Sequence, residues 1–197
     1  MNKKYFQFGE YYYLYFWGNN REALFREEEN YQVFLDLFRK YVSPLSDLYA
    51  YCLLPTHSHL ILRIKDFVDI GCHYFDGQMI WKQINTFFSS YIHWNNKNSN
   101  GTPKIMGSKY LERNLLSLEP LFELIPYIHK NPQSHGIVSD YRFWPYSSYH
   151  SYFTRDRTSF LARILFSDDE LYNTIMEMHE KMIKLEEWSY YQKEMVY

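Results

Sequence analysis

Two apolar runs joined by a very short connection constrain the fold of this chain more than any other feature. The runs are LYAYCLLP (48–55) and SHLILRI (58–64), and they meet tightly at Pro55 and Thr56. A connection this short joins antiparallel neighbours, because parallel strands need a crossover of a dozen or more residues. The middle of the chain is therefore predicted to form two adjacent antiparallel strands.

Hydrophobic spacing predicts further elements on either side of this pair. We expect strands at 11–17 and 109–118, and helices at 25–42, 80–96, 119–131 and 167–188. The helix at 119–131 should stop before Pro132, because the residue before a proline avoids the α region. Ser167 and Glu170 make a capping box for the last helix.

The order of these elements is strand–helix–strand–strand–helix–strand–helix, without strict βαβ alternation. Such an order predicts an α+β fold with an antiparallel sheet and helices on one face. We assign residues 1–153 to this domain and residues 154–197 to a helical C-terminal extension.

Composition limits the classes of protein that fit this sequence. The 197-residue chain has a formal net charge of −2, so a nucleic-acid surface would have to be a local patch. Two cysteines without CxxC spacing exclude a disulfide framework and a zinc ribbon, and they suit a reducing cytosol. The sequence has neither a signal peptide nor an apolar run long enough to cross a membrane, so a cytoplasmic location is expected.

Aromatic residues make up 21% of the chain, an unusually large share. Such rings either fill the core or form a stacking surface for unpaired bases. Composition alone does not choose between the two uses.

His57 and His59 stand at the start of the second apolar run. Side chains alternate faces along a strand, so the two imidazoles project together while Ser58 is turned away. Imidazole is a common ligand of divalent transition metals. A chain with eight histidines also produces such pairs by chance, so the pair alone leaves a metal site and a chance pairing both open.

A second constellation lies on the helix predicted at 119–131. Tyr127 and Asn131 are four residues apart and therefore share a helix face. If this helix packs beside the histidine strand, His57, His59 and Asn131 could hold a divalent ion near the Tyr127 phenol. Alternatively, Tyr127 is a core aromatic and Asn131 is a helix-ending residue. Tyr91 and Asn95 have the same spacing, which by itself does not decide between the two tyrosines.

Three motifs together resemble the REP-associated tyrosine transposases, within the wider family of single-tyrosine, His-x-His insertion-sequence transposases. The first is the Pro-x-His-x-His-hydrophobe pattern, present as PTHSHL (55–60). The second is YIHKNP (127–132) followed by His135 and Gly136, and the third is WPYSSY (144–149). Their order and joint presence, over most of residues 10–153, make the resemblance specific. The resemblance also favours Tyr127 over Tyr91 as the functional tyrosine.

The resemblance implies a ferredoxin-like core of the His-x-His (HUH) endonuclease type that acts on single-stranded or hairpin DNA. It implies that His57, His59 and Asn131 hold Mg²⁺ or Mn²⁺, which polarises the scissile phosphate. Tyr127 would then attack that phosphate and form a 5′-phosphotyrosine link with a free 3′-OH. Relatives include monomers and dimers, so a homodimer stays open.

Basic residues near the proposed site are candidates for phosphate contacts, namely Arg21, Lys109 and Arg113. Two other functions stay open beside the transposase. One is a catalytically inactive, domesticated DNA-hairpin-binding protein of the same fold, which Ser58 and Pro126 favour. The other is a metal hydrolase that uses the histidine pair with a bound water. That site would need an acidic partner, and Asp66 lies far along the strand.

Overall fold

The structure is a computed structural model, and it describes residues 5–18, 22–70, 76–98, 108–115, 119–155, 161 and 168–184. The strands are β1 (Tyr11–Gly18), β2 (Ser46–Leu54), β3 (His57–Ile64) and β4 (Ser108–Leu115). The helices are α1 (Glu28–Tyr41), α2 (Phe67–Ile70), α3 (Gly77–Lys97), α4 (Glu119–Ser134), the 3-10 helix η2 (Tyr141–Phe143), α5 (Tyr149–Phe153) and α7 (Asp169–Lys184).

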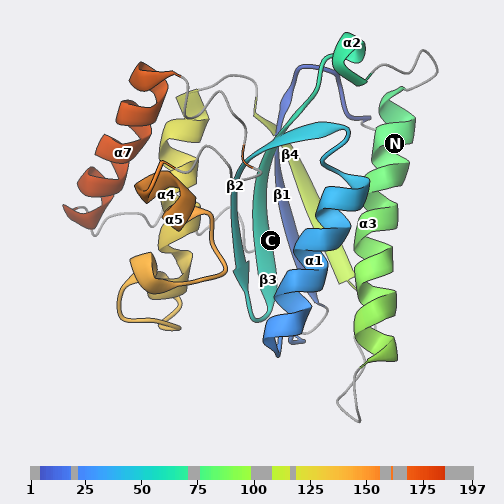
Figure 1. Cartoon of the computed structure of the whole chain (residues 1–197), viewed down its shortest axis with the longest axis horizontal. Helices are drawn as coiled ribbons and strands as arrows, with labels where there is room; N and C mark the ends of the chain where they lie inside the picture. The colour runs from blue at the N-terminus through green and yellow to red at the C-terminus, as the bar shows by residue number, and fades with distance from the viewer. Residues whose placement is uncertain are drawn as a thin grey trace.

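The four strands form one antiparallel sheet in the order β2-β3-β1-β4 (Figure 1). With α1 and α3 as the two crossovers, the order β1-α1-β2-β3-α3-β4 is the ferredoxin-like arrangement. The predicted α+β class is therefore confirmed. The short connection works as expected, since Pro55 and Thr56 form the turn between β2 and β3.

Helices α1 and α3 cover one face of the sheet, which is the pair of helices that the ferredoxin-like core requires. Helix α1 forms because its buried residues recur at helical spacing, behind an acidic first turn and before a basic last turn. Phe16 of β1 points to this face, where its ring stacks on Phe88 of α3 at 4.3 Å and on Phe34 of α1 at 6.2 Å. Most of the aromatic core lies in this layer.

The opposite face of the sheet carries α4, and α7 packs on the outer side of α4 (Figure 1). Strand β3 is consequently buried along nearly its whole length, on both faces. This double burial explains why its sequence reads as a continuous apolar run instead of an alternating one.

Helix α4 continues past the point where we predicted its end, because it runs through Pro132 to Ser134. Pro132 lies in the last turn, where a proline removes only one hydrogen bond of the helix. The turn is continued by the His135 N–H, which donates to the Asn131 carbonyl at 2.9 Å, and by the Ile137 N–H, which donates to the Pro132 carbonyl at 2.8 Å. Pro126 also lies inside the helix, one residue before Tyr127.

The C-terminal helix α7 packs directly against α4. Ser167 of the predicted capping box lies outside the described residues. At the start of the helix, the Asp168 carboxylate accepts a hydrogen bond from the Leu171 N–H at 3.0 Å. Helix α7 is thereby held in place against the helix that carries Tyr127.

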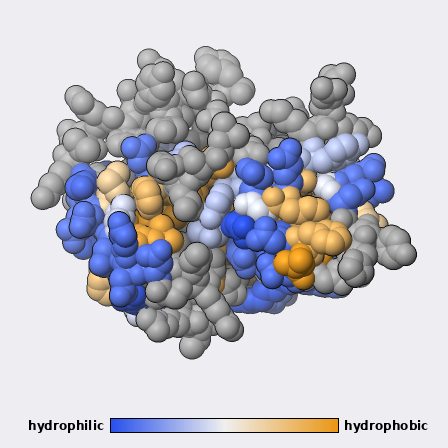
Figure 2. Space-filling view, turned by 90° about the horizontal axis from the view of Figure 1, so that it is seen from above, coloured by the Kyte–Doolittle hydropathy of each residue, from blue (hydrophilic) through white to orange (hydrophobic). Residues whose placement is uncertain are grey.

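The surface mixes polar and apolar side chains. Figure 2 views the molecule from the α2 end, where hydrophobic residues stand among hydrophilic ones. The exposed apolar side chains of this end include Phe67, Val68, Met79 and Trp81. Within the described part of the chain, no helix has both the length and the apolar character needed to span a bilayer.

Candidate functional site

The histidine pair lies on the face of the sheet that α4 covers. His57 and His59 are both buried, and their ring centroids are 4.9 Å apart. They stand opposite Trp17 and Tyr15 of β1 in the strand register. Ser58 pairs with Phe16, whose ring faces α1 and α3. The predicted common face of the two imidazoles is therefore confirmed.

His59 is held by a tyrosine that the sequence did not single out. Its Nδ1 lies 2.6 Å from the hydroxyl of Tyr13, which is buried on the neighbouring strand. The other ring nitrogen, Nε2, is buried and has no hydrogen-bond partner among the described residues. A buried polar atom normally has a partner. When Nδ1 carries the proton and donates it to Tyr13, Nε2 presents a lone pair, as a metal ligand does.

His57 has a similar arrangement on one side of its ring. Its Nδ1 lies 3.0 Å from the hydroxyl of Thr56 in the β2–β3 turn. Burial, with a smaller contribution from His135, lowers the pKa of His57 from 6.5 to about 4. Burial also lowers the pKa of His59 well below its ordinary value, with His57 and His135 adding to the effect. Both imidazoles are therefore neutral near pH 7, which is the form that binds metals.

Tyr127 lies half-buried on α4, close to a second tyrosine. Burial raises its pKa, and the nearby Tyr15 phenol raises it further. The Tyr15 ring centroid lies 5.4 Å from that of His57 and 5.1 Å from that of His59. Tyr15 thus adjoins the histidine pair and also interacts with Tyr127, so the two predicted constellations meet around its ring.

Asn131 is buried one turn after Tyr127. Its amide nitrogen donates to the Tyr127 carbonyl at 3.3 Å, so the side-chain oxygen is the atom suited to a hard cation. Four residues later, the His135 ring lies 5.1 Å from the His57 ring between centroids. The segment just after α4 therefore reaches His57. In the sequence, His135 stood out only by its place in the second motif, and no chemical role was predicted for it.

The donor set at this site suits a divalent metal ion. Two neutral imidazoles and an amide oxygen are ligand types that Mn²⁺ accepts. The Nε2 of His59, which has no partner in the described part of the chain, fits such an ion. In the described ranges, no three or more His, Cys, Asp or Glu side chains are grouped so that they could hold a metal. Asp66 is paired with Arg63 at 2.9 Å at the far end of β3, so it is not the acidic partner that a water-activating hydrolase needs.

Tyr91 and Asn95 have a different role on the other face of the sheet. Tyr91 is fully buried on α3, and its hydroxyl donates to the Leu24 carbonyl at 2.6 Å. The Asn95 amide donates to the same carbonyl at 2.8 Å. Both side chains therefore hold the segment before α1, away from the histidine pair.

The predicted DNA-contact residues receive no test from the structure. Arg21 lies outside the described residues. Lys109 and Arg113 lie in β4, where their backbones stand opposite Trp17 and Tyr13 in the register. All three remain predictions.

The third motif covers the β2 edge of the sheet. The Leu53 N–H donates to the Tyr146 carbonyl at 2.9 Å, and the Ser148 N–H donates to the Tyr51 carbonyl at 2.9 Å. The Trp144 indole donates to the Leu53 carbonyl at 3.0 Å. An uncovered edge strand invites pairing with another chain. WPYSSY thus has a structural role along β2.

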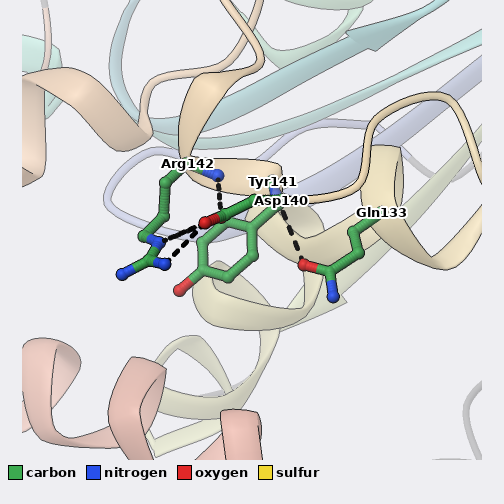
Figure 3. A network of polar contacts seen from close by, with 4 residues as sticks. All are labelled: Gln133, Asp140, Tyr141 and Arg142. Atoms are coloured by element: carbon green, nitrogen blue, oxygen red, sulfur yellow. Dashed lines mark hydrogen bonds and ion pairs between the residues drawn. The ribbon is translucent and has the colours of Figure 1, made fainter.

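A polar pocket follows α4 directly. The Gln133 side-chain oxygen accepts a hydrogen bond from the Tyr141 N–H at 3.3 Å, and Arg142 Nε lies 2.9 Å from both carboxylate oxygens of Asp140 (Figure 3). The Arg142 guanidinium lowers the pKa of Asp140. Lys130 and Ser139 complete the lining. These contacts tie the end of α4 to η2.

Comparison with known proteins identifies the fold. Neither a protein-family profile nor a curated protein matches this sequence. The structure of the REP-associated tyrosine transposase bound to a REP hairpin aligns with a TM-score of 0.56 and 19% identity, over 81% of this chain and 88% of that chain. The two proteins share a fold. The resemblance first seen in the motifs is therefore confirmed at the level of the fold.

A second structure comes from Deinococcus radiodurans and is described as that of a candidate transposase. It aligns over 66% of this chain and 97% of that chain, with 16% identity and a TM-score of 0.32. That similarity is too low to support a conclusion about this protein.

Proposed function

We propose that this protein is a metal-dependent transposase that cleaves and rejoins single-stranded DNA through a covalent tyrosine intermediate. The observation that carries the proposal is the histidine pair, neutral and buried on β3, with a His59 Nε2 that has no partner among the described residues, on the face covered by the Tyr127 helix. The REP hairpin bound by the protein of the same fold supports hairpin DNA as the substrate class.

In this proposal His57, His59 and Asn131 hold Mg²⁺ or Mn²⁺, which when bound acts as a Lewis acid on the scissile phosphate. The Tyr127 oxygen attacks phosphorus as its proton passes to water, the bond from phosphorus to the 3′ oxygen breaks, and that oxygen takes up a proton from water, so the products are a 5′-phosphotyrosine and a free 3′-OH. The bond energy stays in the protein–DNA link, so the 3′-OH of a strand can reverse the step without ATP.

The raised pKa of Tyr127 gives it a defined resting state. Near pH 7 the phenol keeps its proton, and a phenol is a weak nucleophile. The proton must leave as the bond to phosphorus forms, and the raised pKa makes its loss harder. Tyr15, next to both Tyr127 and the histidines, contributes to this by raising the pKa of Tyr127.

The test is direct trapping of the intermediate. The full chain is incubated with labelled hairpin DNA and Mn²⁺, and covalent adducts are separated on a denaturing gel and mapped by mass spectrometry. We expect an adduct that EDTA abolishes and that maps to Tyr127. Cleavage without any adduct, or an adduct at another residue, contradicts the proposal.

A second candidate function is supported by two local features. Ser58 Oγ is buried without a hydrogen-bond partner in the described part of the chain, and Pro126 interrupts the backbone bonding of α4 just before Tyr127. Both fit a catalytically inactive protein that binds DNA hairpins. This alternative predicts salt-dependent hairpin binding with no cleavage and no adduct in any divalent metal.

A further inference from the structure

A chain of buried polar contacts joins α7 to α4 and to the edge of the sheet. His179 of α7 lies with Nε2 at 2.8 Å from Nδ1 of His129 on α4. His129 Nε2 lies 2.7 Å from the hydroxyl of Ser148, which precedes α5. That hydroxyl accepts a hydrogen bond from the Tyr51 N–H of β2 at 2.9 Å. Both histidines are fully or almost fully buried, so the contacts are shielded from water.

The direction of every hydrogen bond in this series of contacts follows from one carbonyl. His179 Nδ1 lies 2.8 Å from the Ile175 carbonyl, which can only accept, so Nδ1 carries the proton. Nε2 of a neutral His179 is then an acceptor, and His129 Nδ1 must donate to it. His129 Nε2 is in turn an acceptor, so Ser148 donates to it. The same hydroxyl also lies 3.2 Å from the Tyr51 carbonyl, a longer contact than the 2.7 Å one.

Both imidazoles are neutral, as this arrangement requires. Burial lowers the pKa of His129 well below its ordinary value, and burial lowers that of His179 to about 4. The rings of Tyr149 and Tyr152 enclose the pair. Replacing one histidine by an apolar residue would leave its neighbour with an unpaired buried group, which is costly in such surroundings.

The position of His129 connects this chain of contacts to the proposed site. His129 lies midway between Tyr127 and Asn131 on α4, and two residues turn a helix by about 200°. It therefore points away from the face that Tyr127 and Asn131 share. A contact that fixes His129 on one side of α4 also fixes the rotation of α4 about its own axis.

We propose that His129, Ser148 and His179 are positioning residues, and that α7 aims Tyr127 and Asn131 at the histidine pair through them. The inference rests on the proposed function of Tyr127. The inference also gives the C-terminal extension a role, since its helix α7 carries His179, the first residue in this series of contacts. A displacement of about 1 Å at reacting groups can lower a rate about 100-fold, so a device that sets helix rotation has a measurable effect.

The test compares three variants of the full chain. His179→Leu removes the acceptor for His129, whereas His179→Gln keeps an oxygen that can accept in its place. Leu171→Ala is the matched control, because it removes a buried side chain of α7 and leaves the polar chain intact. For each variant we would measure hairpin Kd, the thermal midpoint, and the single-turnover rate of adduct formation at saturating DNA and Mn²⁺.

We expect His179→Leu to lower the single-turnover rate by about 10- to 100-fold, with hairpin Kd changed by less than about twofold. His179→Gln should recover the rate to within about threefold, and Leu171→Ala should lower the thermal midpoint without changing the rate of the folded protein. Imidazole ¹⁵N NMR supplies a readout separate from activity, with Nδ1 protonated in both histidines.

Two kinds of failure are distinguishable. If the wild-type protein forms an adduct and His179→Leu reacts at the same rate, the positioning role is wrong and the proposed function stands. The role is equally wrong if Leu171→Ala slows the reaction as much as His179→Leu, or if NMR finds Nε2 protonated in either histidine. If the wild-type protein forms no adduct at all, the proposed function fails and this role fails with it.

Discussion

Tyr91 and Tyr127 are each followed by an asparagine four residues later on a helix, yet the two pairs lie on opposite faces of the sheet. On the α1 and α3 face, Tyr91 and Asn95 both donate to the Leu24 carbonyl and are buried. On the α4 face, Tyr127 is half-buried beside Tyr15. The same spacing therefore serves structure in one place, and in the other it brings a tyrosine beside Tyr15, which adjoins the histidine pair.

The difference comes from what each tyrosine meets. The Tyr91 hydroxyl is committed to a backbone carbonyl inside an aromatic core. Around Tyr127 the neighbours include Tyr15 and, beyond it, two imidazoles of which one has an unpartnered nitrogen in the described structure. Spacing on a helix selects a face, and the elements packed on that face select the role.

The largest expected effect separates the two tyrosines. Tyr127→Phe should lower adduct formation at least about 1000-fold, because the nucleophilic oxygen is lost. Tyr91→Phe should keep the adduct and cost about 1 kcal/mol in the free energy of unfolding, since Asn95 still donates to Leu24. Denaturing gels and urea unfolding measure the two quantities. An adduct that still forms in Tyr127→Phe would mean that Tyr127 is not the nucleophile.

The next effect is a dependence of stability on pH. The buried histidines of the described chain, His57, His59, His129 and His179, all belong to the α4 side of the sheet. Between about pH 6.5 and 4 the unfolded chain binds protons that the folded chain excludes, so the free energy of unfolding falls on acidification through this range. With its pKa lowered to about 4, His57 alone accounts for about 3 kcal/mol.

Unfolding titrations at several pH values test this expectation. His57→Gln should reduce the dependence on pH. Hydrogen exchange should show the amides of α4 losing protection at acid pH before those of α3. If the amides of α3 and α4 lose protection at the same pH, the α4 side of the sheet is not more sensitive to acid than the α3 side.

A smaller effect is expected where a neighbouring hydroxyl orients a proposed ligand. Tyr13→Phe removes the partner of His59 Nδ1, and loss of such a partner weakens metal affinity by about 10- to 100-fold. Tyr12→Phe is the matched control, because Tyr12 adjoins Tyr13 on β1 and its hydroxyl accepts from the N–H of Gln7, which precedes the strand. Mn²⁺ titration followed by calorimetry gives both values, and equal affinities in the two variants would refute the orienting role.

The smallest expected effect concerns Ser58. Its buried hydroxyl has no partner among the described residues, so Ser58→Ala removes a desolvated polar group without breaking a bond. We expect a gain in stability of up to about 1 kcal/mol and an unchanged rate of adduct formation. A loss of more than that in urea unfolding would mean that the hydroxyl contributes to the fold.

The elements that could be predicted are those that depend on local pattern. The turn at Pro55 and Thr56, the shared face of His57 and His59, and the amphipathic α1 all follow from periods of 2 and 3.6 residues. The end of α4 could not be predicted from Pro132 alone, since hydrogen bonds beyond the proline continue the turn. Tyr13 was missed because its contact with His59 depends on the pairing of β1 with β3 across 46 residues, and Tyr15 was missed for the same reason.

By itself, the sequence determined the order of the elements, the antiparallel class and the candidate residues, because each depends on neighbours along the chain. Only the tertiary structure decided that Tyr15 adjoins both histidines, which nitrogen of His59 has no partner among the described residues, and that α7 reaches His129. These outcomes depend on strand register and helix packing, where residues far apart in the chain remove water from one another. Burial then sets the protonation and the hydrogen-bond direction of each group, which local sequence does not encode.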